Sequence, residues 1–246
     1  MTKRIAMWSG PRNISTAMMR SWENRPDCSV VDEPFYACYL KETGFNHPGF
    51  QEIIESQSTS WREVQQQLTE VDVESPIFYQ KHMTHHMLRG NSMDWAKSLA
   101  HVFLIRNPHA VVASYVRSRP TVNQDDIGVL RQFELYEELC ELTEQKIPII
   151  ESDDVLNHPQ QMLSQLCTHL SIPFDQQMLQ WPSGKRDSDG VWAPYWYASV
   201  EQSTHFKRTS QKEIKLTTEQ QRIAEEAMPA YLAMFEKRLL LEGRVV

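Results

Sequence analysis

The chain has 246 residues, a formal net charge of −7, 41% hydrophobic residues and 23% charged residues. This length suits one large α/β domain with a fully buried sheet, and the composition argues against a disordered or fibrous protein. The acidic net charge argues against a nucleic-acid-binding protein, and no apolar run approaches the length of a membrane span.

The N-terminus and the cysteines predict the compartment. Residues 1–4 lead directly into "IAMWSG", without the apolar core or the cleavage pattern of a secretory signal. The four cysteines lie far apart and lack the spacing of metal ligands. We therefore expect a cytoplasmic protein with reduced thiols.

Short apolar runs alternate with longer segments of helical period along the chain. The predicted strands are residues 4–9, 29–33, 77–81, 101–106 and 147–152. The predicted helices are residues 15–25, 48–70, 92–99, 108–118, 126–145, 159–170 and 217–241. This alternation predicts one α/β domain over residues 1–246, in which helices cover both faces of a mainly parallel sheet of about five strands.

Residues 181–216 differ in composition from the rest of the chain. They combine Gly, Pro and Ser with four aromatic residues between Trp192 and Tyr197, and they carry the basic residues Lys185, Arg186, Lys207 and Arg208. Such a composition favours a long functional loop. We expect this segment to form a lid or active-site loop, although its aromatic residues would equally suit a small satellite core.

The stretch "MWSGPRNISTAMMRS" at residues 7–21 predicts a strand, a tight turn and a helix. The first amides of such a helix are unpaired and partly positive, which favours binding of phosphate or sulfate. The turn supplies further charge and hydrogen-bond donors through Arg12, Asn13, Ser15 and Thr16. The P-loop pattern is not matched, so an ordinary capped helix is the alternative.

A second stretch, "HVFLIRNPHAVVASYVRS" at residues 101–118, has the same strand, turn and helix order, with Arg106 at the strand end and Ser114 in the helix. Together the two stretches resemble the sulfotransferase family that uses 3′-phosphoadenosine 5′-phosphosulfate (PAPS). In that family a "PKSGTTW" or "PRSGST" loop, to which "PRNISTAM" is similar, binds the 5′-phosphosulfate. An R-(D/N)-P motif with a serine eight residues after the arginine binds the 3′-phosphate, and "RNPHAVVAS" has this spacing.

The resemblance implies a P-loop-type three-layer sandwich and a nucleotide site. Arg106 and Ser114 would bind the 3′-phosphate, with Lys207 and Arg208 of the lid as further candidates. The 5′-phosphosulfate would lie on the loop formed by Arg12, Asn13, Ile14, Ser15 and Thr16. Ile14 departs from the family, in which glycine is common at this position, and isoleucine resists backbone angles that glycine adopts.

The catalytic residues are predicted from the ends of two further strands. "DEPFY" at residues 32–36 resembles the "KEPHFF" stretch of family members whose glutamate is the general base, which implies that Glu33 is the base. Lys81 ends the next strand, and with Arg12 it would stabilise the leaving group. Asp32 is the nearest rival for the base, Glu33 alternatively stabilises a helix start, and Lys81 alternatively forms a plain ion pair.

The stretch "KHMTHH" at residues 81–86 contains His82, His85 and His86. No fourth ligand stands at a helical spacing, which argues against a metal site, and we expect no metal. Another branch of the family uses a histidine two residues after this lysine as the general base, and this chain has Met83 at that position. His82 or His85 therefore remains an alternative base.

The resulting prediction is a PAPS-dependent sulfotransferase that transfers a sulfuryl group to a hydroxyl or amine of a small acceptor and releases adenosine 3′,5′-bisphosphate (PAP). The alternatives are an NTP-dependent kinase and a non-catalytic nucleotide-binding protein of the same fold. The sequence does not define the acceptor.

Overall fold

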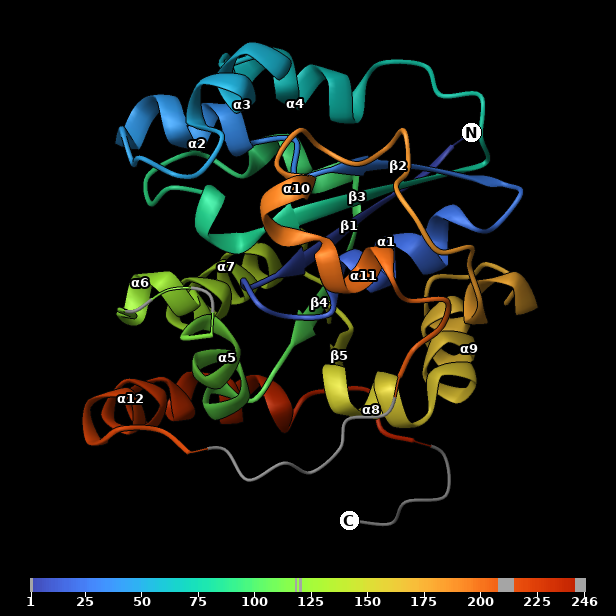
Figure 1. Ribbon diagram of the computed structural model, residues 1–246. Coiled ribbons are helices and arrows are strands. Elements are labelled where there is room, and N and C mark those ends of the chain that lie inside the picture. Colours follow the sequence, from blue (N-terminus) through green and yellow to red (C-terminus); the bar gives the residue numbers. More distant parts are fainter. Residues whose placement is uncertain (1, 118, 120, 208–214, 242–246) are drawn as a thin grey trace.

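A computed structural model describes residues 2–117, 119, 121–207 and 215–241. Its centre is a sheet of five strands, β1 (Lys3–Ser9), β2 (Cys28–Asp32), β3 (Ile77–Met83), β4 (Ala100–Ile105) and β5 (Ile149–Glu151), in the order β2-β3-β1-β4-β5. Every neighbouring pair is parallel (Figure 1). This confirms the predicted α/β fold with a central parallel sheet of five strands.

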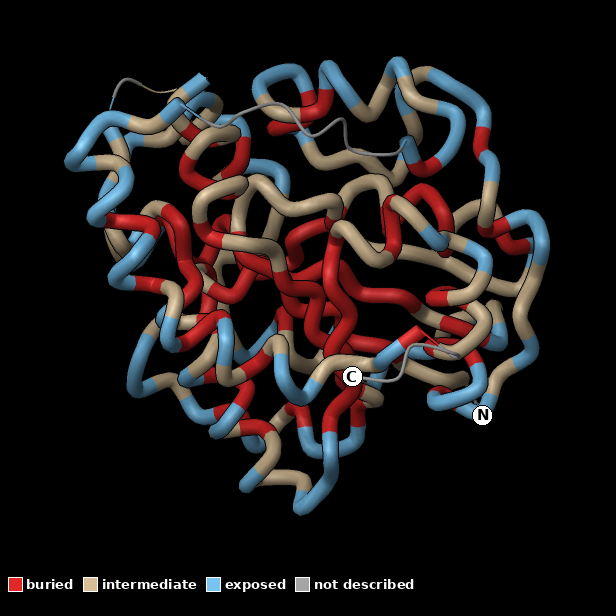
Figure 2. The backbone as a smooth tube through the Cα atoms, turned by 90° about the horizontal axis from the view of Figure 1, so that it is seen from below, coloured by how far each residue is buried: buried red, intermediate tan, exposed pale blue. Residues whose placement is uncertain are grey.

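The central strand β1 is buried on both faces because the apolar residues Ile5–Trp8 follow one another without polar interruption. In β1, Ile5 and Met7 face one core cluster, whereas Ala6 and Trp8 face the other. Helices α1 (Ser15–Glu23), α8 (Ser152–Asn157) and α9 (Pro159–His169) cover the first face. The second face is covered by α4 (Trp61–Thr69), α5 (Pro108–Tyr115), α7 (Val129–Thr143) and α12 (Thr218–Phe235). Figure 2 shows the buried residues concentrated at the centre of the molecule.

A third apolar cluster lies beyond the carboxyl ends of β2 and β3. It joins α2 (Tyr36–Thr43) and α3 (Phe50–Ser56) to α10 (Ala193–Trp196) and the residue that follows it, Tyr197. The remaining short elements are α6 (Gln124–Ile127), α11 (Ala198–Glu201) and the 3₁₀ helices η1 (Thr84–His86), η2 (Asp94–Ser98) and η3 (Gln176–Leu179). No helix in the described ranges is both long and apolar enough to cross a membrane.

Two predicted helices are wrong in extent because local breaks override their periodicity. The predicted helix 48–70 is divided into α3 and α4, since Gln57 is extended and Ser60 caps a new helix by accepting a hydrogen bond from the Glu63 amide. The predicted helix 126–145 is interrupted at Gly128, where φ is 66° and an added Cβ would lie 3.1 Å from Pro11. Helix α2 was not predicted.

The last predicted strand, 147–152, is shorter than expected. Only Ile149–Glu151 are extended, because the Glu151 carboxylate accepts hydrogen bonds from the amides of Asp153 and Asp154 and thereby starts α8. The predicted helix 92–99 is the 3₁₀ helix η2. By contrast, proline starts α5 and α9, and Thr217 caps α12, as predicted.

The sheet order explains where polar side chains gather. From β1 at the centre, the chain passes to one side for β2 and β3 and then to the other side for β4 and β5. Ligands of open parallel sheets bind where the connections diverge in this way, outside the carboxyl ends of the strands.

Candidate active site

The turn after β1 holds Arg12 in the left-handed backbone region, with φ of 55°. Ile14 has φ of −86°, so the residue that departs from the family does not need the positive φ that favours glycine, and it packs against the core cluster under α1. No side chain caps α1, which leaves the amides of its first turn directed toward the edge of the sheet. Ser15 is buried and Thr16 half-buried in this turn.

The side chain of Asn13 stabilises the turn through hydrogen bonds. Its amide nitrogen donates to the Leu104 carbonyl oxygen at 2.8 Å, and its amide oxygen accepts from the Ile14 amide and from the Ser152 hydroxyl. These contacts tie the turn to the ends of β4 and β5 and engage the side chain within the protein. Asn13 would therefore contribute to anion binding mainly by fixing the conformation of the loop.

The two predicted anion-binding stretches meet at Arg12. Its Nε donates to the Ser114 hydroxyl at 3.2 Å, and Arg106 Nη1 donates to the Arg12 carbonyl oxygen at 2.6 Å. Within the described ranges neither arginine forms an ion pair with a carboxylate, and Arg106 Nε is buried without a hydrogen-bond partner. Burial lowers the pKa of Arg12, and the charges of Arg106 and Arg117 lower it further. Three like charges thus converge where an anion would stabilise them.

A second polar cluster lies at the ends of β2 and β3. Lys81 Nζ donates to Asp32 Oδ1 at 2.8 Å, to Glu33 Oε1 at 2.6 Å and to the Tyr197 hydroxyl at 2.6 Å. An ammonium group has three protons, so all of them are engaged. Burial alone would lower the pKa of Lys81, but the two carboxylates raise it well above its ordinary value. Lys81 is therefore a buried cation that is hydrogen-bonded to both carboxylates.

Glu33 follows β2 with φ of 40°, an unusual angle for a residue with a side chain. Its amide donates to the Lys81 carbonyl oxygen, and its own carbonyl oxygen accepts from Gln57 Nε2 and from the Tyr36 amide, which hold this conformation. Burial raises the pKa of Glu33, with Lys81 opposing and Asp32 adding to the shift. A buried carboxylate of raised pKa is suited to accept a proton.

Part of the predicted lid is built into this cluster. The Tyr197 hydroxyl donates to Asp32 Oδ2 at 2.6 Å and accepts from Trp192 Nε1 at 3.1 Å, while the Gly190 amide donates to Asp32 Oδ2 at 3.2 Å. Asp189 pairs with the buried Arg20 of α1 at 2.6 Å. Asp32 thus accepts three hydrogen bonds from within the protein. The sequence contained no local signal for the role of Tyr197, which stands 116 positions after Lys81.

Two aromatic residues of the segment 181–216 lie in the core of the protein. Trp181 and Phe206 pack edge to face, with ring centroids 5.0 Å apart, in the core cluster under α1. Lys207 is exposed, and Arg208 lies outside the described residues. In the described part of this segment, residues 189–197 reach the polar cluster, and the assignment of the segment as a lid or active-site loop stays a prediction.

The three histidines occupy different surroundings. His82 stacks on Trp8, with ring centroids 4.3 Å apart, and contacts Gln80 in the core cluster on the other side of β3. His86 lies with Nε2 3.9 Å from Glu33 Oε2, and His85 contacts it edge to face. Burial lowers the pKa of His82 and His85 to about 3. The histidine beside the carboxylate is thus His86, which the sequence singled out only as a metal candidate.

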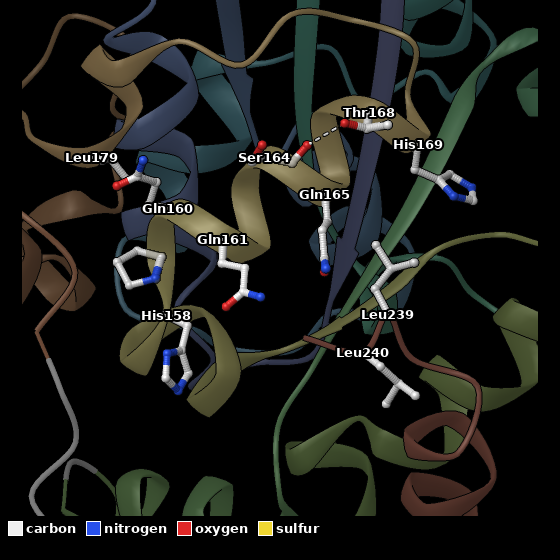
Figure 3. Close-up of a pocket in the computed structure, with 11 residues that line it drawn as sticks. His158, Gln160, Gln161, Ser164, Gln165, Thr168, His169, Leu179, Leu239 and Leu240 are labelled. Carbon is white, nitrogen blue, oxygen red and sulfur yellow. Dashed lines mark hydrogen bonds between the residues drawn. The ribbon is translucent and has the colours of Figure 1, made fainter. Parts of the chain in front are cut away.

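Two other observations delimit the site. No group of three or more His, Cys, Asp and Glu side chains in the described part of the chain is arranged to hold a metal ion. A cavity of about 950 Å³ lies along α9 (Figure 3). Uncharged polar side chains and leucines dominate its lining, which includes Gln161, Gln165, Leu239 and Leu240, and no predicted site residue borders it.

The fold and this site define an α/β protein whose polar side chains gather at the carboxyl edge of a parallel sheet. Residues 3–238 match the family described as Sulfotransferase domain, and the chain belongs to this family.

Two curated relatives from Arabidopsis thaliana are named Branched-chain-amino-acid aminotransferase-like protein 1 and 2. The first is 32% identical over 227 residues, which are 92% of this chain and 40% of the relative. The second is 32% identical over 202 residues, which are 82% of this chain and 36% of the relative. The chain therefore spans about two fifths of the length of these relatives.

Solved structures of sulfotransferases share the fold. A sulfotransferase domain from the curacin biosynthetic pathway is similar with a TM-score of 0.55 and 18% identity, over 93% of this chain and 98% of that one. A sulfotransferase from Alicyclobacillus acidocaldarius has a TM-score of 0.55 and 10% identity, over 98% of both chains. Mouse sulfotransferase SULT7A1, solved in complex with PAP, has a TM-score of 0.53 and 12% identity, over 93% of this chain and 84% of that one.

Proposed function

We propose that this chain transfers a sulfuryl group from PAPS to a hydroxyl or amine of a small acceptor, with Glu33 as general base. The observation that carries the proposal is a buried carboxylate with raised pKa that lies at the same sheet edge as an uncapped helix N-terminus and converging arginines. The family and the fold support sulfuryl transfer, and the complex of a structural neighbour with PAP supports the choice of nucleotide.

Different basic and polar residues bind the two anionic groups of the nucleotide. In this proposal the amides at the start of α1, with Ser15, Thr16 and Arg12, hold the 5′-phosphosulfate, while Arg106 and Ser114 hold the 3′-phosphate. Arg117, whose charge acts on both Arg12 and Arg106, adds to the positive potential. These groups stabilise the negative charge that the departing phosphate gains as the bond to sulfur breaks.

Glu33 takes the proton from the acceptor hydroxyl as the acceptor oxygen forms its bond to sulfur and PAP leaves on the opposite side. Lys81 orients the Glu33 carboxylate and offsets the negative charge of Asp32. To contact the reacting phosphosulfate, Lys81 would have to exchange one of its three hydrogen bonds. The general base of such a step contributes about 10²–10⁴-fold to the rate.

A thermal-shift titration with PAP, with AMP, and with ATP in the presence and absence of magnesium tests the nucleotide. A ligand at one hundred times its dissociation constant adds about 2.7 kcal/mol, which for this size raises the melting temperature by roughly 5–10 °C. We expect this shift with PAP without magnesium, and little with AMP. A shift with magnesium and ATP alone would support the kinase interpretation instead.

Binding of PAP without turnover would separate an enzyme from a nucleotide-binding protein. The assay is the formation of PAP from PAPS in the presence of a panel of alcohols, phenols and amines. Acceptor-dependent release of PAP is the expected result, and its absence across a broad panel would favour the non-catalytic alternative.

A further inference from the structure

Arg119 is a cation beside the candidate active site. It has no role in the proposed nucleotide site or in the catalytic cluster. Its guanidinium lies 5.8 Å from the ring centre of Tyr115 and 5.3 Å from that of Trp196, and so it joins the end of α5 to the end of α10. It forms no ion pair with any carboxylate in the described ranges. The nearby Asp126 accepts hydrogen bonds from the Tyr115 hydroxyl and the Asn123 amide. Arg119 is half-buried, and one of its donors is engaged by the Tyr115 hydroxyl. Because a guanidinium carries five N–H donors and has no carboxylate partner in the described ranges, it keeps donors for a ligand.

An aromatic wall connects Arg119 to Glu33. Trp196 packs against the cluster that contains Tyr36 and Tyr39. His86 is stacked between these two tyrosines, with ring centroids 4.4 and 4.9 Å away, and its Nε2 is 3.9 Å from Glu33. The buried Nδ1 atoms of His85 and His86 have no hydrogen-bond partner among the residues that the structure describes.

This wall is uncharged near neutral pH. Burial lowers the pKa of His47 to about 4 and that of His85 to about 3, and it lowers the pKa of His86 well below its ordinary value. The charges of Glu33 and Arg119 both act on the Tyr36 hydroxyl, in opposite directions. A neutral aromatic wall thus has a base at one end and a cation at the other.

We propose that Arg119 selects acceptors that carry a carboxylate as well as the hydroxyl that receives the sulfuryl group. This inference rests on the proposed function and extends it to the class of acceptor. The hydroxyl lies at Glu33, the carbon skeleton packs on the neutral rings, and the carboxylate pairs with Arg119 in the two-pronged geometry that guanidinium favours. Discrimination arises because an uncharged acceptor leaves Arg119 without its partner.

The test compares para-hydroxyphenylacetate and ε-hydroxycaproate with their primary amides as acceptors of sulfuryl groups from PAPS. Sulfated product is measured with the wild-type protein, Arg119→Gln, Arg119→Lys and the control Arg89→Gln, which changes an exposed arginine paired with Glu134. PAP affinity and melting temperature are measured for each. We expect kcat/KM of the wild type to favour an acid over its amide at least tenfold, and Arg119→Gln to remove this preference without changing PAP affinity.

Each other outcome has a defined meaning. If acid and amide react equally with the wild type, or if neither reacts while PAP binds, the assignment to Arg119 is wrong. If Arg119→Gln lowers kcat/KM equally for both acceptors and also lowers the melting temperature, Arg119 only stabilises the position of Trp196. A loss of PAP affinity would place Arg119 in the nucleotide site. Failure of the wild type to bind PAP would contradict the proposed function itself.

Discussion

Lys81 and Glu33 stand at the carboxyl ends of adjacent parallel strands, with 2.6 Å between Lys81 Nζ and Glu33 Oε1. The same ammonium lies 2.8 Å from Asp32, so one cation faces two buried carboxylates. Two negative charges and one positive charge leave the cluster with an excess of negative charge when both carboxylates are ionised. This excess is one reason why Glu33 binds a proton more readily than an ordinary glutamate.

The first prediction concerns Glu33. Glu33→Gln keeps the size of the side chain and removes the base, so transfer should fall by about 10²–10⁴-fold while PAP affinity is retained. Single-turnover transfer and calorimetric titration with PAP measure the two quantities. Glu42→Gln, a change on α2 outside the cluster, is the matched control. Full transfer activity in Glu33→Gln would remove Glu33 from the role of base.

Asp32 should control the pH at which Glu33 becomes active. Its negative charge raises the pKa of Glu33, so Asp32→Asn should lower that pKa, and the acidic limb of the kcat profile should move to lower pH. Transfer should survive, because the base remains. A profile of kcat against pH for both proteins checks the shift, and an unmoved limb would mean that another group controls the rate.

Arg106 should discriminate nucleotides by their 3′-phosphate. Hydrogen bonds to a charged group contribute about 1.5–3 kcal/mol, so Arg106→Gln should weaken PAP roughly 10–100-fold and leave AMP affinity unchanged. Because Arg106 also donates to the Arg12 carbonyl oxygen, Ser114→Ala serves as a milder second variant at the same phosphate. Equal losses for PAP and AMP would place these residues elsewhere on the nucleotide.

Tyr197 should stabilise the fold through its hydroxyl. Tyr197→Phe removes hydrogen bonds to Lys81, Asp32 and Trp192 and leaves buried polar groups unsatisfied. At about 1 kcal/mol for each bond, the free energy of unfolding should fall by about 2–4 kcal/mol in urea titrations. Tyr195→Phe, at an exposed residue of the preceding helix α10, should change little. Similar stability of both variants would show that the segment is held by apolar packing alone.

Glu151 should make stability depend on pH. Burial raises its pKa to about 7 in the folded protein. The folded state therefore retains a proton that the unfolded state releases, and stability should decrease as the pH rises from the ordinary glutamate value to about 7. At 1.36 kcal/mol for each pH unit, the loss is of order 3 kcal/mol. Glu151→Gln preserves the helix cap and should flatten this dependence in urea titrations, whereas the exposed Glu141→Gln should not.

Part of the fold and site could be predicted because the relevant signals are local. Unbroken apolar runs identify buried strands, and the arginine and serine of "RNPHAVVAS" stand in one turn and helix. Breaks within helices were harder to predict. Gly128 ends one helix and starts another with φ of 66°, and a Cβ at this position would lie 3.1 Å from Pro11, a residue far away in the chain.

The sequence by itself determined the parallel sheet, the turn at Arg12 and the strand ends that carry Glu33 and Lys81, because periodicity and motif spacing depend on neighbours along the chain. Only the tertiary structure decided which partners these groups have. It saturates Lys81 with Asp32, Glu33 and Tyr197, buries His82 in the core and places His86 beside Glu33. The physical reason is that burial and hydrogen bonding between distant segments arise from packing, which no local pattern encodes.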